Sequence, residues 1–226
     1  MEYEARALRR RLRHADGASG TPLTVRTVGI GASGLDELET GLAGERPSAV
    51  LATGVAGGLS PELRPGDLVI AREVGPEPAG TWLSPDPSLV ERAIAAARAG
   101  ALPARAGRLL TAPSVVATPL SKADAWRRHT ALAVDMESLP VLRWAARMGV
   151  PALAVRAVAD GPAETLPSCL VEAIGTRGGL RPGRVLGWAA RPAVALAAWR
   201  FWRRSRLALA RLGGFLVTFT RGPLDL

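Results

Sequence analysis

The chain has 226 residues, 48% of them hydrophobic and 25 of them glycine, which suits one α/β domain large enough to bury a full core. Its formal charge is +9, and arginine supplies every basic residue except Lys122. Because no nucleic-acid-binding module accompanies this charge, we expect no nucleic-acid partner. A GC-rich genome is an alternative explanation for the use of arginine in place of lysine.

Cysteine and histidine are scarce, which limits the chemistry that the chain can perform. Cys169 is the only cysteine, so no intrachain disulfide can form, and a reducing cytoplasm is the expected compartment. His14 and His129 stand alone, without the ligand spacing of a metal site. No apolar run approaches the ~18 residues of a membrane span, and we find no secretory signal. We therefore expect a cytoplasmic protein without a bound metal.

Hydrophobic periodicity predicts strands and helices that alternate along most of the chain. Strands are expected at residues 23–31, 49–53, 67–73, 105–111, 131–135 and 152–158. Helices are expected at residues 1–13, 35–42, 89–99 and 121–129, the last capped by Ser121, and a further helix follows residue 137. This alternation is typical of an α/β fold.

A glycine-rich segment at residues 54–58 (GVAGG) follows one predicted strand and precedes the next. Glycines let the backbone approach a ligand closely and offer N–H donors to it. Loops are often rich in glycine, so it is the place of this segment after a strand that makes it a candidate ligand-binding turn.

Carboxylates stand at both ends of a strand–helix–strand unit in the middle of the chain. Asp135 and Glu137 lie where the first strand gives way to the helix, and Asp160 lies just past the second strand. Ligands of open α/β sheets bind outside the carboxyl ends of the strands, so these groups are well placed to meet one ligand. Arg156 stands four residues before Asp160, an even offset that favours one face of the strand.

The tail, residues 176–226, differs in character from the α/β domain at residues 1–175, since its residues 191–212 are rich in arginine and tryptophan. If the segment is a helix with ~100° per residue, four arginines lie on one side of it: Arg200, Arg203, Arg204 and Arg211. Mostly opposite lie Val194, Phe201, Trp202, Leu209 and Leu212, whereas Leu196 and Leu207 fall on the arginine side. A basic amphipathic helix with tryptophans suits a membrane surface. The alternative is a terminal helix packed on its own domain or on a second subunit.

Two sequence motifs carry a family resemblance. D-M-E-S at residues 135–138, followed by a helix and G-V-P-A-L-A-V-R-A-V-A-D at 149–160, resembles the end of the catalytic domain in the nucleoside phosphorylase and nucleosidase superfamily. T-G-V-A-G-G-L at 53–59, followed by L-R-P-G-D-L-V-I at 63–70, resembles an upstream part of the same domain. This superfamily includes the methylthioadenosine/S-adenosylhomocysteine nucleosidases, and both motifs occur here in the expected order.

Within the superfamily, the chain resembles the hopanoid-associated phosphorylases most closely. It shares A-G-G-L-x-P-x-L-R-P-G-D-L at residues 56–68 and A-V-D-M-E-S at 133–138. It also has Leu166-Pro167 after the last motif and Arg191-Pro192 near a late helix. The inferred substrate of that family is adenosylhopane, a lipid that carries a 5′-linked adenosine.

The resemblance implies a three-layer α/β/α fold with a central mixed sheet, and it implies roles for four residues. Asp160 matches the general acid that protonates N7 of the leaving adenine, for which its pKa must be raised. Glu4 matches the carboxylate that positions and activates the attacking water. Glu137 matches the acceptor of hydrogen bonds from the ribose hydroxyls, and Met136 matches the residue that packs on the ribose.

Three more residues are assigned to substrate binding. The glycine-rich turn lies beside the ribose and the nucleophile in the superfamily, which makes Ala56 and Gly57 candidates. Arg156 is expected to hold a carboxylate, Glu4 or Glu137, or to serve an anion. We expect no cofactor, although phosphate is a candidate co-substrate, and because relatives form dimers or larger assemblies we expect a homo-oligomer.

The chain departs from the superfamily pattern at three points. Val55 stands where many nucleosidases have serine, and Ala159 stands where serine precedes the catalytic aspartate, so two polar contacts are lost. The resemblance also places a strand before the Met-Glu-x-Glu motif with which this chain begins. We therefore expect a strand of about five to seven residues to be encoded upstream of Met1.

These matches favour cleavage of the N-glycosidic bond of a 5′-substituted adenosine, first of all adenosylhopane, by phosphorolysis or hydrolysis in hopanoid synthesis. The tail supports a lipid-linked substrate and a position at the inner face of the membrane. A soluble methylthioadenosine/S-adenosylhomocysteine nucleosidase is the alternative with the same chemistry. A non-catalytic membrane-associated scaffold is the alternative from a different class; Val55 and Ala159 favour it, and the presence of all four residues with family roles opposes it.

Overall fold

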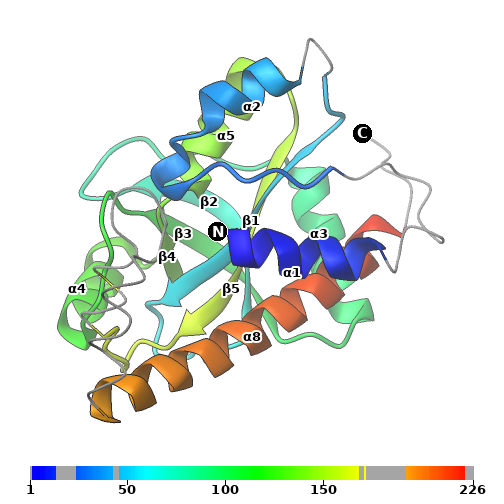
Figure 1. Ribbon diagram of the computed structural model, residues 1–226. Coiled ribbons are helices and arrows are strands. Elements are labelled where there is room, and N and C mark those ends of the chain that lie inside the picture. The colour runs from blue at the N-terminus through cyan, green and yellow to red at the C-terminus, as the bar shows by residue number, and fades with distance from the viewer. Residues whose placement is uncertain (1, 14–23, 43–45, 168–170, 172–191, 222–226) are drawn as a thin grey trace.

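A computed structural model of the chain describes residues 2–13, 24–42, 46–167, 171 and 192–221 (Figure 1). Its helices are α1 (Glu2–Arg13), α2 (Leu35–Gly41), α3 (Pro87–Ala99), α4 (Pro119–His129), α5 (Ser138–Arg147) and α8 (Pro192–Thr220), with a short 3-10 helix, η1, at Ile30–Ala32. Its strands are β1 (Val50–Gly58), β2 (Leu68–Pro76), β3 (Ala104–Thr111), β4 (Ala133–Asp135) and β5 (Ala152–Asp160). Met1, Cys169, Arg191 and the boundary expected after residue 175 lie outside the described residues.

The five strands form one mixed sheet that closes on itself in the order β1-β4-β3-β2-β5. β5 pairs in parallel with β1 and antiparallel with β2. β3 pairs in parallel with both β2 and β4, and the short β4 runs antiparallel to β1. The expected α/β fold with a central mixed sheet is thereby confirmed.

β5 is buried along its whole length because helices cover both faces of the sheet. Successive side chains of a strand point to opposite faces. Leu153, Val155 and Ala157 accordingly join a core cluster with residues of α1, α3 and α8. Ala154 and Val158 join a second cluster with residues of α5. The helices thus lie in two layers on either side of the sheet, as the three-layer expectation requires.

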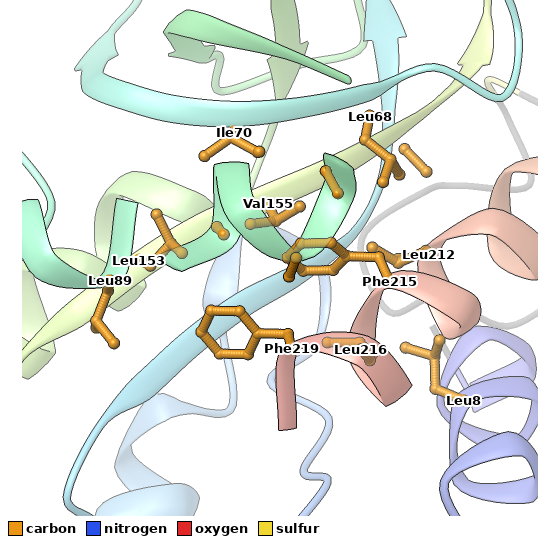
Figure 2. Packing of buried hydrophobic residues seen from close by; sticks show 14 of the residues in the cluster. Leu8, Leu68, Ile70, Leu89, Leu153, Val155, Leu212, Phe215, Leu216 and Phe219 are labelled. Atoms are coloured by element: carbon orange, nitrogen blue, oxygen red, sulfur yellow. The ribbon is translucent and has the colours of Figure 1, made fainter. Parts of the chain in front are cut away.

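The C-terminal half of α8 is part of the first core cluster. Figure 2 shows Phe215 and Phe219 of this helix near Leu153 and Val155 of β5. The two phenylalanine rings stack with centroids 5.5 Å apart, and α8 also packs along α1 (Figure 1). Burial of this apolar surface stabilises the helix on its own domain.

The N-terminal half of α8 presents its large apolar side chains to solvent. The exposed ones are Leu196 (46%), Trp199 (49%), Trp202 (45%) and Leu207 (43%). The guanidinium carbon of Arg203 lies 4.9 Å from the ring centroid of Trp199, and that of Arg206 lies 4.7 Å from the ring centroid of Trp202. Among the described helices, none combines the length and apolar character that spanning a bilayer requires.

The amphipathic pattern grouped Trp202 with Leu209 and Leu212, opposite the arginines. In the structure the two leucines are buried whereas Trp202 is exposed beside Arg206. The reason is that the buried positions of the described part of α8 begin only at Ala208. The helix therefore changes from an exposed segment to a core segment along its length.

The prediction of a strand at residues 23–31 is wrong for the residues that the structure describes, 24–31. Residues 24–29 have no regular secondary structure, and η1 begins directly after them. Gly29 and Gly31 have φ values of +74° and +62°, a left-handed conformation that interrupts an extended chain. The five strands also pair with one another in a closed ring, which leaves no sheet edge for this segment.

Three predicted element boundaries also need correction. β1 continues through residues 54–58, so the glycine-rich segment is the end of a strand and not a turn. β5 continues to Asp160. α4 begins at Pro119, because Thr118 is its N-cap and accepts a hydrogen bond from the backbone N–H of Ser121.

Candidate active site

β1 and β5 run side by side and bring charged residues to the sheet at two points. Gly54 pairs with Arg156 in the parallel register, and Gly57 pairs with Asp160. Between these pairs the register shifts, because β5 has one extra residue, Ala159, which forms a β-bulge. The bulge interrupts the alternation of side chains along β5. Arg156 and Asp160 therefore do not share one face of the strand, as their even spacing had predicted, and they belong to two separate charge clusters.

Arg156 is buried and pairs with residues of the segment that joins β4 to α5. Its Nε lies 2.7 Å from Asp135 Oδ2 and donates a hydrogen bond of 3.1 Å to Ser138 Oγ. Thr111 Oγ1 donates to Asp135 Oδ1 at 2.8 Å, which fixes the carboxylate from its other side. Such pairing is what a buried guanidinium requires. Asp135, expected only as a carboxylate that could meet a ligand, is thus a closer partner of Arg156 than Glu137.

Glu137 stands at the N-terminus of α5, but its side chain does not cap the helix. Its Oε1 instead accepts a hydrogen bond of 3.2 Å from the backbone N–H of Gly31. Its Oε2 lies 3.7 Å from Arg156 Nη2. Burial raises the pKa of Glu137, Arg156 opposes this shift, and the negative charge of Asp135 adds to it. The carboxylate is therefore mostly buried, between the backbone of Gly31 and the guanidinium of Arg156.

Glu4 of α1 comes to the same region from far away in the sequence. A methyl carbon placed on Gly54 would lie 2.5 Å from Arg156 Nη1 and 3.6 Å from Glu4 Oε2. Both side chains thus lie against the backbone of β1 at this glycine. Glu4 also raises the pKa of Glu137 through repulsion between the two negative charges. The structure brings together Glu4, Glu137 and Arg156, which the sequence analysis had assigned to one site.

Asp160 is buried and forms an ion pair with Lys122 of α4. Lys122 Nζ donates a hydrogen bond to Asp160 Oδ2. The same ammonium donates to the backbone carbonyl of Gly161 at 2.8 Å and to that of Glu164 at 2.9 Å. Lys122 received no role in the sequence analysis. The signal that marks it is its identity as the single lysine of an arginine-rich chain.

The pKa of Asp160 is raised, and burial is the main cause. Lys122 opposes the rise through its charge and its hydrogen bond. Glu164 adds to the rise, and Arg204 opposes it. A carboxyl group with a raised pKa keeps its proton to higher pH, as a general acid must.

The remaining predicted substrate-binding residues lie on β1 and after β4. Gly57 lies against Asp160, since a methyl carbon placed on it would be 3.4 Å from Oδ2. Ala56 is buried, and its side chain packs in the core cluster that contains α5. Met136 is half-buried in the bend that joins β4 to α5.

The two positions where serine was expected have apolar surroundings. Val55 packs against the core cluster that contains α1, α3 and α8. Ala159, the extra residue of the β-bulge, is almost fully buried. Neither side chain can donate or accept a hydrogen bond. The loss of a polar ligand contact at these two positions stays a prediction.

The arrangement supplies the groups that acid-assisted cleavage of a glycosidic bond needs. A buried carboxyl group can protonate a leaving group, a second carboxylate held near an arginine can accept hydrogen bonds from hydroxyls, and a third from α1 can orient a nucleophile. The part of the chain that the structure describes contains no cluster of three or more His, Cys, Asp or Glu side chains that could hold a metal ion.

A family model described as the phosphorylase superfamily matches residues 10–186. The sequence is 30% identical over 131 residues to a 5′-methylthioadenosine/S-adenosylhomocysteine nucleosidase of Halalkalibacterium halodurans. That match covers 51% of this chain and 57% of the relative, so the chain spans little more than half the length of the curated relative that it matches.

Solved structures of nucleosidases have the same fold. The 5′-methylthioadenosine/S-adenosylhomocysteine nucleosidase of Neisseria meningitidis, in complex with methylthio-immucillin-A, superposes with a TM-score of 0.66 at 16% identity, covering 93% of this chain and 94% of that one. Futalosine hydrolase of Helicobacter pylori superposes with a TM-score of 0.62 at 16% identity, covering 93% of each chain. At these identities the likeness establishes the nucleosidase-like fold.

Proposed function

The chain belongs to the phosphorylase superfamily, and on that premise we propose that it cleaves the N-glycosidic bond of a 5′-substituted adenosine and releases adenine. Its sequence relative and a solved structure of the same fold are named as methylthioadenosine/S-adenosylhomocysteine nucleosidases, which supports this reaction. The observation that carries the proposal is Asp160, which is buried at the end of β5 and whose pKa is raised by that burial, the direction that a general acid needs.

Asp160 is the general acid of the proposed reaction. When the C1′–N9 bond breaks, its electron pair moves onto adenine, which is a poor leaving group as an anion. The Asp160 carboxyl group gives its proton to N7, so adenine leaves as a neutral molecule. A positioned general acid typically contributes about 10²–10⁴-fold to the rate.

The remaining site residues hold the sugar and the nucleophile. Glu137 accepts hydrogen bonds from the ribose hydroxyls, and Arg156 holds it in place across 3.7 Å. Met136, Ala56 and Gly57 lie beside the ribose. Glu4 orients the attacking water, and phosphate that attacks the same carbon would make the reaction a phosphorolysis. The proposed reaction needs no cofactor.

Adenosylhopane is the proposed substrate, because the exposed half of α8 suits an enzyme that works at a membrane. Trp199 and Trp202 lie exposed beside Arg203 and Arg206, a combination of aromatic and cationic groups that binds the interface of an anionic bilayer. We propose that residues 191–212, of which Arg191 lies outside the described residues, hold the enzyme at the inner, cytoplasmic face of the membrane. We propose that it acts there as a homo-oligomer.

A soluble methylthioadenosine/S-adenosylhomocysteine nucleosidase is the second candidate, favoured by the names of the relatives. This activity needs the same site residues, but it does not explain why Trp199 and Trp202 are exposed. A non-catalytic membrane-associated scaffold is the third candidate. The apolar surroundings of Val55 and Ala159 favour it, whereas the ion-paired acid and the assembled carboxylates oppose it.

Adenine release tests the function. The purified protein is given adenosylhopane in detergent and, in parallel, methylthioadenosine, each with and without phosphate. We expect adenine from adenosylhopane, and dependence on phosphate identifies the nucleophile. Asp160→Asn serves as the matched control, because it keeps the shape of the side chain and removes the acid.

Each outcome selects one candidate. Adenine from methylthioadenosine alone makes the protein a soluble nucleosidase and contradicts the lipid substrate. No adenine from either compound, while the protein is folded, contradicts the enzymatic proposal and favours the scaffold.

A further inference from the structure

Lys122 occupies a position that is unusual for this chain. Of 29 basic residues it alone is lysine, and its relative exposure is 0%. A chain that uses arginine at every other basic position has lysine at the buried position that contacts Asp160. Arginine usage that follows from genome composition does not explain this exception, so the site itself requires an ammonium group.

The hydrogen bonds of Lys122 match the donors of an ammonium ion. Nζ has three N–H groups and three acceptors: Asp160 Oδ2 and the carbonyl oxygens of Gly161 and Glu164. A guanidinium has five donors in a flat, wider fork, and two of them would lack an acceptor in a site with no solvent exposure. Lys122 therefore holds both the carboxyl group of Asp160 and the loop that follows it.

We propose that Lys122 is a positioning residue that fixes the orientation of Asp160 and stabilises the carboxylate that remains after Asp160 has protonated adenine. The inference rests on the proposed function, in which Asp160 is the general acid. Lys122 bonds through Oδ2, and no described residue donates a hydrogen bond to Oδ1, so Oδ1 is the oxygen that carries the transferred proton in this proposal.

The proton and the charges balance as follows. The oxygen of the attacking water bonds to C1′ as the C1′–N9 electron pair goes to adenine, and the proton that this water loses passes to the solvent. The proton of the Asp160 carboxyl group goes to N7, and Asp160 becomes a carboxylate. Lys122 keeps its three protons, and its positive charge neutralises the new carboxylate. After the products leave, water returns a proton to Asp160.

Other charged groups also act on Asp160, but they are paired with each other. Arg204 Nη1 of α8 lies 2.6 Å from Glu164 Oε2 in the loop after β5. Their effects on Asp160 have opposite signs, since Glu164 is negative and Arg204 positive. Lys122 is therefore the cation whose removal changes the charge balance at Asp160 most directly.

The kinetic test compares Lys122→Met with Lys122→Arg. Activity requires protonated Asp160, so it declines as the pH rises through the pKa of this group. Removal of an adjacent cation raises a carboxyl pKa by about 1–3 units, so Lys122→Met moves the alkaline limb of the kcat profile to higher pH. The maximal kcat falls about tenfold or more, because the buried carboxylate that forms is no longer neutralised. Lys122→Arg keeps the charge but leaves two donors without acceptors, so we expect the limb to remain near its wild-type position while kcat falls.

A second measurement does not depend on activity. Lysine labelled with 15N at Nζ gives one side-chain signal, since the chain has a single lysine. We expect this signal to shift at the pH where Asp160 ionises, and Asp160→Asn to abolish that step. The measurement uses the full chain, with an expression tag that contains no lysine.

The two measurements separate this inference from the proposed function. The role of Lys122 is overturned if the 15N signal of its Nζ does not change at the pH where Asp160 ionises. It is also overturned if the alkaline limb of the kcat–pH profile does not move in Lys122→Met. If the wild-type protein releases no adenine but its labelled signal shows the step, the proposed function fails and the coupling of Lys122 to Asp160 stands.

Discussion

Burial raises the pKa of both Asp160 and Glu137, yet the proposed reaction needs one of them protonated and the other ionised. Each group also has a cation that favours its ionised form, Lys122 at Asp160 and Arg156 at Glu137. Asp160 Oδ2 accepts from an ammonium, and its Oδ1 accepts no hydrogen bond from a described residue. Glu137 accepts a hydrogen bond from Gly31 N–H and lies near Arg156, which both favour its ionised form.

Glu137→Gln should change how stability depends on pH. A carboxyl group whose pKa is raised by folding stabilises the native state below its ordinary pKa of 4.5, and this contribution is lost as the pH rises through the folded value. We therefore expect the free energy of unfolding of the wild type to fall from pH 4.5 upward more steeply than that of Glu137→Gln. Urea denaturation at a series of pH values measures this, and parallel curves for the two proteins would contradict it.

Gly54→Ala should disturb the Arg156 cluster. Gly54 has a φ of +154°, and a methyl carbon there would lie 2.5 Å from Arg156 Nη1. We expect a loss of about 1–3 kcal/mol in the free energy of unfolding, since a strained backbone costs this much and the guanidinium must move. The control is Gly214→Ala in α8, where a methyl carbon has open space. It should stabilise by about 0.5–1 kcal/mol, and equal effects of the two substitutions would contradict the geometry.

Single residues differ in how far the sequence predicts their roles. Glu4 and Glu137 were assigned through motif matches and Arg156 from its spacing to Asp160, and the structure brings the three together at Gly54. Lys122 could not be found in this way, because it stands 38 residues before Asp160 on a helix without a sequence motif. The ion pair depends on how α4 packs against the end of β5, which no local pattern records.

Among the elements, α8 combines two environments in one helix. Its last turns bury Phe215 and Phe219 in the core, whereas its earlier turns expose Trp199 and Trp202. Phe215→Ala should therefore cost about 3–5 kcal/mol of stability, because it leaves a cavity. Trp199→Ala should change stability by no more than about 0.5 kcal/mol, as is usual for an exposed site. Thermal denaturation measures the stability of both variants. A large loss of stability in Trp199→Ala would show that this tryptophan is packed against other residues in solution.

Three strands, β2, β3 and β5, were predicted within a few residues of their observed bounds. β5 is buried along its whole length and β2 at its first four residues, whereas β3 is buried only at its last three. The segment at residues 24–31 has the alternation of a strand, but pairing depends on a free sheet edge, and the closed ring of strands offers none. The continuation of β1 through its glycines was missed because glycine is a weak strand former.

For the whole molecule, net charge and the exposed half of α8 together predict binding to anionic membranes. The formal charge of +9 attracts the protein to such a surface, and Trp199 and Trp202 can insert at the interface. We expect co-sedimentation with vesicles that contain an anionic lipid and much less with neutral vesicles. The double variant Trp199→Ala/Trp202→Ala should lose most of this binding.

The matched control for the vesicle experiment is Leu120→Ala, which removes an exposed apolar side chain (76%) from α4 and not from α8. It should bind vesicles as the wild type does. Equal binding of the tryptophan double variant and the wild type would contradict the membrane surface, and would leave the soluble nucleosidase as the better proposal.

Protonation of adenine N7 by Asp160 can be tested directly with a substrate that lacks this nitrogen. The rate of base release is compared for the 5′-substituted adenosine that the wild type cleaves and for its 7-deaza counterpart, in which N7 is replaced by carbon. We expect that the wild type does not cleave the 7-deaza compound and that Asp160→Asn lowers kcat on the natural base by about 10²–10⁴-fold. Cleavage of both compounds at similar rates, or full activity of Asp160→Asn, would contradict it.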